Sequence, residues 1–339
     1  MADVENFMGV GASDIEKIMG VATGDIEAVM GLGIVTASWH GTRGVGAGGN
    51  DGTGYNERLD VIQYKAVTSS GNTSDFGDMT EPTAWTGSVS NTTRGVFMGG
   101  YTTTYTSGTA GIEYITIGST GNTSDFGDLT AGIEAAGSGG NGVRGLQHYH
   151  SNTDKQVDYI TIASVGDAAD FGDTNIAGRF KGAWNNATRV GFCGGVISGN
   201  TRNDINYFTV ATTGNSSDFG NLGLSVQDSS CLESDTRACI NIGYTGVGAG
   251  YNSRAIDYVA PASTGNGSDF GDMLSGQEGT HIDNGLSNLT RGEWWGGENS
   301  SGEAMDEIQY ITIASTGNST DAGNLLGNCE YGPGCLSGT

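Results

Sequence analysis

Residues 114–130, with the sequence YITIGSTGNTSDFGDLT, form a stretch that recurs six times and decides the fold of the chain. Each copy begins with a tyrosine, and an aspartate follows eleven residues later with no insertion in any copy. The six tyrosines are Tyr64, Tyr114, Tyr159, Tyr207, Tyr258 and Tyr310. The six aspartates are Asp75, Asp125, Asp170, Asp218, Asp269 and Asp321. Such a period indicates a repeat architecture, in which each copy buries its apolar face against its neighbours.

The aspartate of each copy opens a short motif, Asp-Phe-Gly followed by Asp or Asn, in which Ala322 replaces Phe in the last copy. Aspartates in such a position accept backbone N–H groups, so Asp125 and Asp128 are expected to hold a structural turn. Kinases also contain Asp-Phe-Gly, but only once and together with a catalytic-loop His-Arg-Asp and a strand Lys, which this chain lacks. The alternating aspartates and closing glutamate of calcium loops are also absent, which favours a turn over a metal site.

An arginine opens each unit, and six of the fourteen basic residues occupy this one position. A short apolar run such as 95–98 follows it and ends at a glycine pair, here Gly99 and Gly100. The β-branched and aromatic content, with two-fold alternation, predicts one strand here and a second strand over 112–117. We expect the arginine to be a buried strut that donates to carbonyls or to an aspartate of a neighbouring turn. The six arginines are Arg43, Arg94, Arg144, Arg189, Arg237 and Arg291.

Units of about fifty residues with several short strands predict the blades of a β-propeller. The residue after Asp-Phe-Gly precedes the next arginine by sixteen positions in four of five junctions, as from Asp128 to Arg144. Counted from Asn324, the next arginine would fall one position beyond Thr339, and Arg43 supplies the missing start. The stretch near 325–336 should therefore pair into the blade begun by Arg43 and close a six-bladed ring without an open edge.

The repeat resembles the kelch repeat in its glycine doublet, its later tyrosine and an aromatic residue after that, which is Phe here and Trp in kelch proteins. The resemblance covers residues 39–339, and it departs from kelch in a longer spacing between the two aromatic residues, filled by Ser-Thr-Gly-Asn. It implies an all-β fold, a six-bladed kelch-like β-propeller. We expect this propeller over 34–339 and a short helical anchor segment over 1–33.

Residues 1–33 have a separate period of eleven residues, with the copies VENFMGVGASD, IEKIMGVATGD and IEAVMGLGIVT. Asp14 and Asp25 are suitable helix N-caps and a glycine follows each apolar run, so helices of one or two turns are expected over 15–19 and 26–30. Helices this short need a partner surface to be stable in water. A right-handed coiled coil and a flexible tail are the alternatives. The apolar residues expected to anchor the segment are Ile15, Ile18, Met19, Ile26 and Met30.

The charge of the chain is lopsided, with 38 acidic residues against 14 basic ones and a net charge of −24. Such a surface is repelled by nucleic acid and by anionic membranes, so neither is an expected partner. No apolar run is long enough for a membrane span, and the first residues, MADVENFMGV, do not resemble a secretory signal. The five cysteines occupy no common repeat position and are expected to be reduced thiols. A disulfide between Cys329 and Cys335 is the alternative.

Two groups of residues depart from the repeat and are candidates for ligand binding. His148, Tyr149 and His150 interrupt the glycine pair of the third unit, but a third metal ligand is lacking, as is the Tyr, His and cross-linked Cys set of a galactose-oxidase-like copper site. Trp294 and Trp295 could stack on sugar rings, although blade packing is the favoured interpretation. No catalytic triad, phosphate loop or isolated pair of carboxylates is present, so we expect no enzyme, metal or cofactor.

The eleven-residue array together with the Gly-rich Asp-Phe-Gly-Asp repeat resembles virion proteins of tailed bacteriophages, which carry short Ile-x-Lys-x-x-Gly-Val segments such as residues 15–21. This resemblance implies a tail fibre, spike or surface decoration, assembled in the host cytoplasm. Residues 1–33 would then bind other virion proteins, and the propeller would bind a host-surface glycan or protein. Other copies of the chain are a further expected partner, in a homo-oligomer. A cellular protein-interaction kelch propeller and a glycan-active enzyme are the alternatives, the last disfavoured because no acid pair is confined to one blade.

Overall fold

The computed structural model of the chain describes residues 40–53, 57–103, 108–134, 137–246, 253–274, 285–299, 301–329 and 333–339, together with six two-residue strands between residues 6 and 33. The chain divides into two compact units, Met1–Ser38 and Trp39–Thr339, so the boundary lies slightly beyond the expected residue 33.

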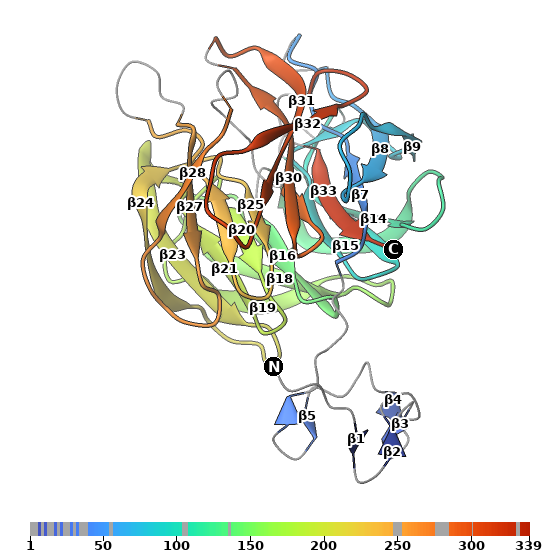
Figure 1. Ribbon diagram of the computed structural model, residues 1–339, viewed down its shortest axis with the longest axis vertical. Coiled ribbons are helices and arrows are strands. Elements are labelled where there is room, and N and C mark those ends of the chain that lie inside the picture. Colours follow the sequence, from blue (N-terminus) through green and yellow to red (C-terminus); the bar gives the residue numbers. More distant parts are fainter. Residues whose placement is uncertain are drawn as a thin grey trace. The chain divides into compact units, whose positions relative to one another are not determined.

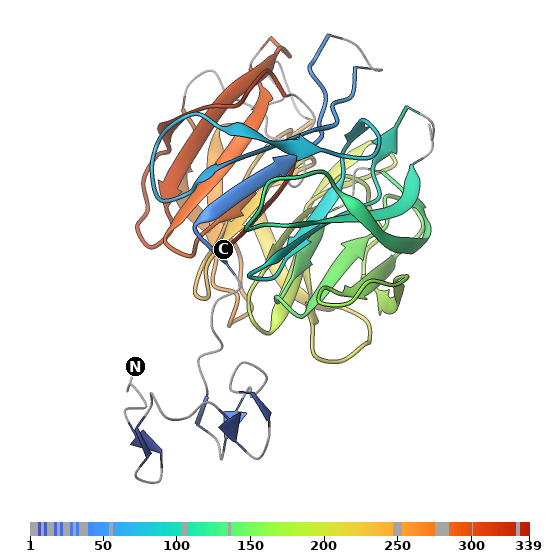
Figure 2. The ribbon, with the colours of Figure 1, turned by 90° about the vertical axis from the view of Figure 1, so that its right-hand side faces the viewer.

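The second unit is a six-bladed β-propeller, as expected, and each blade is an antiparallel sheet of four main strands (Figure 1, Figure 2). Blades are numbered here by their repeat arginine. Blade 1 contains β33 (Gly334–Gly338), β7 (Arg43–Ala47), β8 (Val61–Ala66) and β9 (Ser74–Asp78). Blade 2 contains β11 (Gly87–Ser90), β12 (Arg94–Met98), β14 (Thr109–Thr116) and β15 (Ser124–Ile133). Blade 3 contains β16 (Ser138–Gly140), β17 (Arg144–His148), β18 (Gln156–Thr161) and β19 (Ala169–Asp173).

The other three blades repeat this order. Blade 4 contains β20 (Gly182–Asn185), β21 (Arg189–Cys193), β23 (Asn200–Thr209) and β24 (Ser217–Val226), with the short β22 (Val196–Ile197) paired to β23. Blade 5 contains β25 (Cys231–Glu233), β26 (Ala238–Asn241), β27 (Ala255–Val259) and β28 (Ser268–Asp272). Blade 6 contains β29 (Gly285–Ser287), β30 (Arg291–Glu298), β31 (Ala304–Thr312) and β32 (Thr320–Asn324). A two-stranded sheet of β10 (Thr83–Ala84) and β13 (Tyr101–Thr102) extends from blade 2.

The ring is closed by the C-terminal strand. β33 pairs with β7 in blade 1, with Leu336 opposite Val45, so the first and last segments of the propeller share one sheet. The first strand of each blade contacts its counterparts in both neighbouring blades, and these six inner strands surround the axis. The pairing predicted from the count of residues is therefore confirmed, and no inner strand is left with an open edge.

Hydrophobic clusters fill the spaces between the blades. At four of the six junctions the residue two positions after the repeat arginine shares a cluster with the residue that follows the repeat tyrosine of the next blade, as Val45 does with Ile115 and Val96 with Ile160. The phenylalanine of each Asp-Phe-Gly motif is buried in the same clusters and meets the tyrosine of its own blade edge to face, as Phe76 does with Tyr64 at a centroid distance of 5.8 Å. The regular apolar positions of the repeat are thus the core of the ring.

The Asp-Phe-Gly motif lies in the outer strand of each blade, which corrects the expectation of a turn. Gly77 has φ +154° at a β-bulge between β8 and β9, and a Cβ added to it would lie 2.4 Å from the carbonyl oxygen of Gly121 in the next blade. Only glycine permits this approach. The repeat aspartates are exposed on these strands, and Asp170 and Asp321 accept hydrogen bonds from the N–H of the glycine two residues later.

The Ser-Thr-Gly-Asn segment locks each blade to the preceding one. In the first junction the N–H of Gly121 donates to the carbonyl of Phe76 over 2.8 Å, and the N–H of Thr123 donates to the carbonyl of Asp78 over 3.0 Å. The side chain of Asn122 accepts from the N–H of Asp78 over 3.1 Å. Equivalent bonds occur at every junction, including the one from blade 6 to blade 1. This lock explains the longer spacing that separates the repeat from the kelch pattern.

The repeat arginines also connect blades. Nη1 of Arg94 donates to the carbonyl of Ile162 in the next blade over 3.0 Å, and its guanidinium lies 4.5 Å from the ring centroid of Tyr114. Five of the six arginines donate to such a carbonyl, which confirms the strut. These arginines are half-buried and have no aspartate partner among the residues that the structure describes, and only Arg291 has a buried carboxylate partner there, Glu293. The expectation of an aspartate partner in a neighbouring turn is therefore corrected.

The first unit contains three two-residue hairpins in its described positions. The paired strands are β1 (Asn6–Phe7) with β2 (Val10–Gly11), β3 (Lys17–Ile18) with β4 (Val21–Ala22), and β5 (Ala28–Val29) with β6 (Leu32–Gly33). The expected helices are therefore wrong at Lys17–Ile18 and Ala28–Val29, while Ile15, Met19, Ile26 and Met30 lie outside the described residues. A two-residue link containing glycine between β-branched residues suits a hairpin, and the segments are too short to nucleate helices.

Candidate functional site

Strand direction divides the loops of the propeller between two faces. One face, called the repeat face here, carries short loops such as 91–93 and the Ser-Thr-Gly-Asn locks. The opposite face carries the links that differ most among blades, for example 48–60 in blade 1 and 149–155 in blade 3. We call this the variable-loop face. Since loops can change without disturbing the core, it is the face on which specificity can be built.

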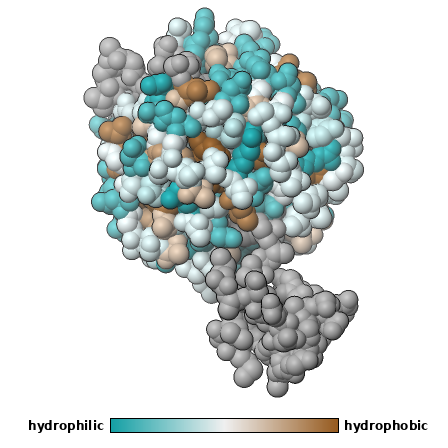
Figure 3. Space-filling view, viewed as in Figure 1, coloured by the Kyte–Doolittle hydropathy of each residue, from teal (hydrophilic) through white to brown (hydrophobic). Residues whose placement is uncertain are grey.

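Most basic residues other than the struts belong to segments of the variable-loop face of this acidic protein. Of the fourteen basic residues, six are the struts, Lys17 is in the first unit, and Lys65 is in a buried ion pair. The other six belong to segments of the variable-loop face, and they are Arg58, Lys155, Arg179, Lys181, Arg202 and Arg254. The side of the propeller seen in Figure 3 mixes hydrophilic and intermediate areas with scattered hydrophobic ones.

In three blades, backbone pairing continues beyond the two inner strands toward this face. Ala84 pairs with Tyr101 in blade 2, Arg179 with Val196 in blade 4, and Gln227 with Tyr244 in blade 5. The residues that follow the first member of each pair have left-handed backbones without being glycine: Trp85 with φ 55°, Phe180 with φ 55° and Asp228 with φ 57°. All three stand nine positions before a repeat arginine. Strained backbone shared by equivalent positions is typical of functional surfaces.

A cationic–aromatic cluster occupies the arc of this face from blade 1 to blade 4. Its members are Arg58, Trp85, Tyr101, Glu134, His150, Arg179 and Phe180. The guanidinium of Arg58 lies over the ring of Tyr101, 4.1 Å from its centroid. The ring of Trp85 meets that of Tyr101 at 5.7 Å and an interplanar angle of 67°. These two aromatic rings are half-buried, and each leaves part of its surface accessible.

The second half of the cluster is fixed by hydrogen bonds. Nε of Arg179 donates to Nε2 of His150 over 3.0 Å, and Nδ1 of His150 lies 3.5 Å from Oε1 of Glu134. A neutral histidine with its proton on Nδ1 satisfies both contacts. Phe180 meets the His150 ring edge to face at 4.5 Å. The hydrogen bond with His150, aided by the charges of Arg179 and Arg58, lowers the pKa of Glu134 and keeps it ionised.

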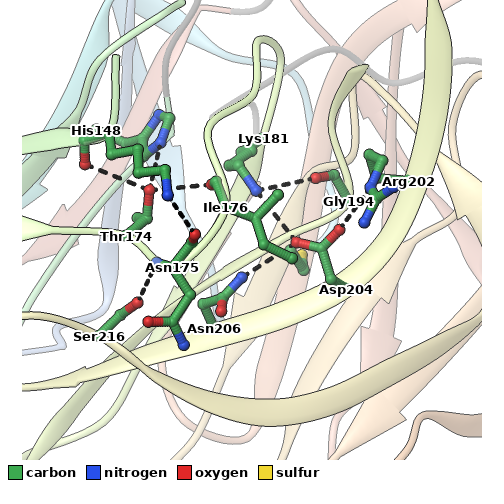
Figure 4. A network of polar contacts seen from close by, with 12 residues as sticks. His148, Thr174, Asn175, Ile176, Lys181, Gly194, Arg202, Asp204, Asn206 and Ser216 are labelled. Carbon is green, nitrogen blue, oxygen red and sulfur yellow. Dashed lines mark hydrogen bonds and ion pairs between the residues drawn. The ribbon is translucent and has the colours of Figure 1, made fainter. Parts of the chain in front are cut away.

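A buried polar network lies next to the cluster in the chain, around Lys181 and Asp204 (Figure 4). Nζ of Lys181 lies 3.3 Å from the carbonyl of Gly194 and 3.4 Å from Oδ2 of Asp204, and Nε of Arg202 lies 3.0 Å from Oδ1 of Asp204. Asn206 donates to the same carboxylate over 3.1 Å. Lys181 is fully buried, and burial lowers its pKa. Because Lys181 directly follows Phe180, this network holds the loop that carries Arg179 and Phe180.

The candidate ligand-binding residues from the sequence separate in the structure. His150 belongs to the cluster, with its side chain only 4% exposed. His148 is buried beside Phe192, and burial and the charge of Lys181 hold its pKa well below the usual range. Tyr149 is 7% exposed, and its hydroxyl lies 3.1 Å from Oδ2 of Asp158, with burial raising its pKa to about 12. These placements give His148 and Tyr149 packing positions beneath the face.

The two tryptophans and the cysteines are also internal. Trp294 and Trp295 are 0% exposed, so their rings are not presented to a ligand, and the burial favours the packing interpretation. All five cysteines are buried, and no disulfide is formed among them. Sequence reasoning did not select Trp85, Tyr101, Arg179 or Phe180, because they lie outside the Tyr-to-Asp stretch and the arginine strand by which the repeat was recognised. One signal could have found part of the cluster: Arg58 and Arg179 are among the few basic residues outside the repeat arginine position.

Serine side chains link the inner strands around the axis, with Ser90 donating to the carbonyl of Ser337, Ser337 to that of Ser287, and Ser287 to that of Glu233. The side chain of His40 is 7% exposed there, and a cavity of about 40 Å³ lies beside it. Burial lowers the pKa of His40 to about 4. This region around the axis is packed and offers little room for a ligand.

In the described part of the chain, no three or more His, Cys, Asp and Glu side chains are grouped to hold a metal ion. No helix among the described residues is long and apolar enough to cross a membrane. In comparisons with known proteins, the chain matches no protein-family model and no curated protein.

Proposed function

We propose that the chain is a non-enzymatic structural and attachment protein of a tailed-bacteriophage virion, as a tail fibre, spike or surface decoration. In this proposal residues 1–33 bind other virion proteins, and the variable-loop face binds a glycan or protein of the host surface. The observation that carries it is that the two faces of the propeller contain different kinds of residue. Conserved repeat residues serve the locks and struts, whereas the remaining cations and the strained aromatic positions gather on the opposite face.

The six locks and the C-terminal pairing make a ring in which every blade is tied to both neighbours. A rigid ring can carry loops of changing length and sequence because those loops contribute little to its core. An attachment protein needs this property, since its target differs from one host to another. The regular repeat supports a structural role and the variable loops support recognition.

The accessible chemistry of the variable-loop face suits binding better than catalysis. Glu134 is ionised through its contact with His150, and Lys181 is fully buried in an ion network. A general acid–base pair requires two groups with separated pKa values that both reach a substrate. The cluster instead presents guanidinium groups and aromatic rings, which bind without a proton transfer.

Mass spectrometry and immunogold labelling of purified virions test the proposal. The chain is expected in the particle, with label on an exterior structure. A full-length variant with Ile15, Ile18 and Ile26 replaced by Asp should be lost from virions and still bind host cells, because only the anchor has changed. Detection in infected or uninfected cells but never in particles would overturn the proposal and favour a cellular interaction propeller.

A further inference from the structure

We propose that the cationic–aromatic cluster is a subsite for the carboxylate of an acidic sugar, with the sugar ring packed on its aromatic residues. This inference rests on the proposed attachment function and names the class of glycan that the variable-loop face takes. It is carried by two guanidinium groups with unused donors, by the aromatic rings beside them and by the charge balance around Glu134.

Arg58 is the first of these groups. The residue is 8% exposed, yet its guanidinium makes no hydrogen bond and no ion pair with any residue in the described part of the chain. Its guanidinium lies over the ring of Tyr101, 4.1 Å from the ring centroid. No nitrogen of Arg58 is among the buried polar atoms without a partner in the described residues, so these donors are open to solvent. Five N–H donors in a planar fork match a carboxylate, which a ligand would supply.

Arg179 is the second group. Its Nε is bound to His150, while its two terminal nitrogens donate to no residue that the structure describes. The ring of Phe180 lies 5.2 Å from the guanidinium carbon, so the side chain is held by both a hydrogen bond and an aromatic contact. This fixed orientation reduces the entropy lost when a ligand binds. The terminal nitrogens of Arg179 are thus preorganised donors.

The charges of the cluster leave room for one added anion. Arg58 and Arg179 act on the same carboxylate, since both lower the pKa of Glu134, and Glu134 is 28% exposed between them. The guanidinium groups of Arg58 and Arg179 therefore face one carboxylate, that of Glu134. A ligand carboxylate would give the second guanidinium an anionic partner. A polyanion such as nucleic acid is disfavoured by the net charge of −24 on the whole protein.

The aromatic members explain why the ligand is a sugar. Trp85, Tyr101 and Phe180 are half-buried rings on a polar face, and the left-handed backbones of Trp85 and Phe180 place these residues at equivalent points of two blades. A sugar ring offers C–H groups to aromatic faces and hydroxyl groups to the surrounding polar atoms. A simple carboxylic acid would use the two arginines and leave these rings without a contact.

Isothermal titration calorimetry with the full-length protein tests the subsite. The probes are oligosaccharides that contain glucuronic acid or sialic acid, and the matched controls are the same oligosaccharides with the carboxylate reduced to a hydroxymethyl group. Carboxyl reduction is expected to weaken binding about 10-fold or more, since a hydrogen bond to a charged group contributes about 1.5–3 kcal/mol. A third probe carries sulfate in place of the carboxylate and shows whether any anion suffices. Reduced and sulfated probes that both bind as tightly as the carboxylated probe would overturn the inference.

The protein variants are Arg58→Met and Arg179→Met, with Arg254→Met as the control, because Arg254 is a half-buried arginine of the same face outside the cluster. Arg58→Met and Arg179→Met should each weaken binding of the carboxylated probe about 10-fold or more, and Arg254→Met less than about 2-fold. Arg58→Lys keeps the charge but loses the planar fork, so its loss of affinity should be intermediate. This conservative variant keeps the test possible if Arg58→Met does not fold.

The outcomes separate this inference from the proposed function. Carboxylate-dependent binding that the cluster variants abolish supports the subsite even if the chain is absent from virions, in which case only the virion proposal fails. Strong binding to neutral surface glycans that the cluster variants leave unchanged overturns the subsite and leaves the attachment function standing. Unchanged carboxylate binding in both arginine variants would also overturn it.

Discussion

A buried ion pair at the junction between blade 6 and blade 1 yields the sharpest prediction for stability. Nζ of Lys65 lies 2.8 Å from Oε1 of Glu293, which is 0% exposed. Nε of Arg291 lies 3.0 Å from the same oxygen, and Nε1 of Trp295 donates to Oε2 over 3.0 Å. The residues equivalent to Glu293 are Val45, Val96, Leu146, Gly191 and Cys239, and those equivalent to Lys65 are Ile115, Ile160, Phe208, Val259 and Ile311.

Glu293→Val, which copies blades 1 and 2, is expected to cost about 3–5 kcal/mol because it leaves Lys65 buried without its carboxylate. Lys65→Ile should cost less, since Glu293 keeps Arg291 and Trp295 as partners. The double variant restores the apolar pair of the other five junctions. Its stability should lie within about 1 kcal/mol of the unmodified protein or above it, because apolar replacement of a buried pair is often neutral or stabilising.

Denaturant unfolding of the protein and the three variants at pH 7 and fixed salt measures these losses and their coupling. Burial lowers the pKa of Lys65 below its usual 10.5 even with Glu293 present, and loss of Glu293 should lower it further. The unfolded chain then binds more protons than the folded one, so the loss in Glu293→Val should shrink as the pH rises toward about 10.5. Losses that are small, additive and independent of pH would refute the reasoning.

Three further predictions follow from the junctions and the buried histidines. Arg94→Met should cost about 1.5–3 kcal/mol in denaturant unfolding, from a charged hydrogen bond and an aromatic contact, whereas Arg254→Met should cost less than about 0.5 kcal/mol; equal losses would mean that the strut has no structural role. Gly77→Ala should destabilise the ring more than Gly121→Ala, since both glycines have positive φ but only the first would clash; the melting temperatures of the two variants decide this. His148→Met, which copies Met98 of blade 2, should reduce the loss of stability on acidification from pH 7 to pH 5 by about 2 kcal/mol, because the folded-state pKa of His148 is lowered and the unfolded chain takes up the proton; an unchanged pH dependence of unfolding would contradict it.

The repeat made most of the propeller predictable. Six copies without insertions between Tyr and Asp require equivalent units, and the count from Asn324 to Thr339 required the C-terminal strand to complete the blade of Arg43. The outer strand was mistaken for a turn because Asp, Gly and Asn usually mark turns, whereas here Gly77 serves a bulge that faces the carbonyl of Gly121. A close approach between blades leaves no signal within one repeat.

The candidate site was less predictable for a related reason. His150 drew attention because it replaced a repeat glycine, but its partners Glu134 and Arg179 come from links that have no register with the repeat. Arg58 and Tyr101 are far apart in the chain and meet only because blades 1 and 2 are adjacent. Local sequence also could not distinguish short helices from hairpins in residues 1–33, because Ile, Val, Met and Gly at this spacing suit both.

The central claim is that the variable-loop face is the recognition surface, and hydrogen–deuterium exchange tests it most directly. The full-length protein is compared alone and with surface polysaccharide from the host bacterium that the proposed virion function requires. We expect slower exchange in 57–60, 99–103, 149–151 and 176–181, with no change in the repeat-face loops 91–93 and 119–123. Protection confined to the repeat face, or polysaccharide binding with no protection on the variable-loop face, would contradict the account.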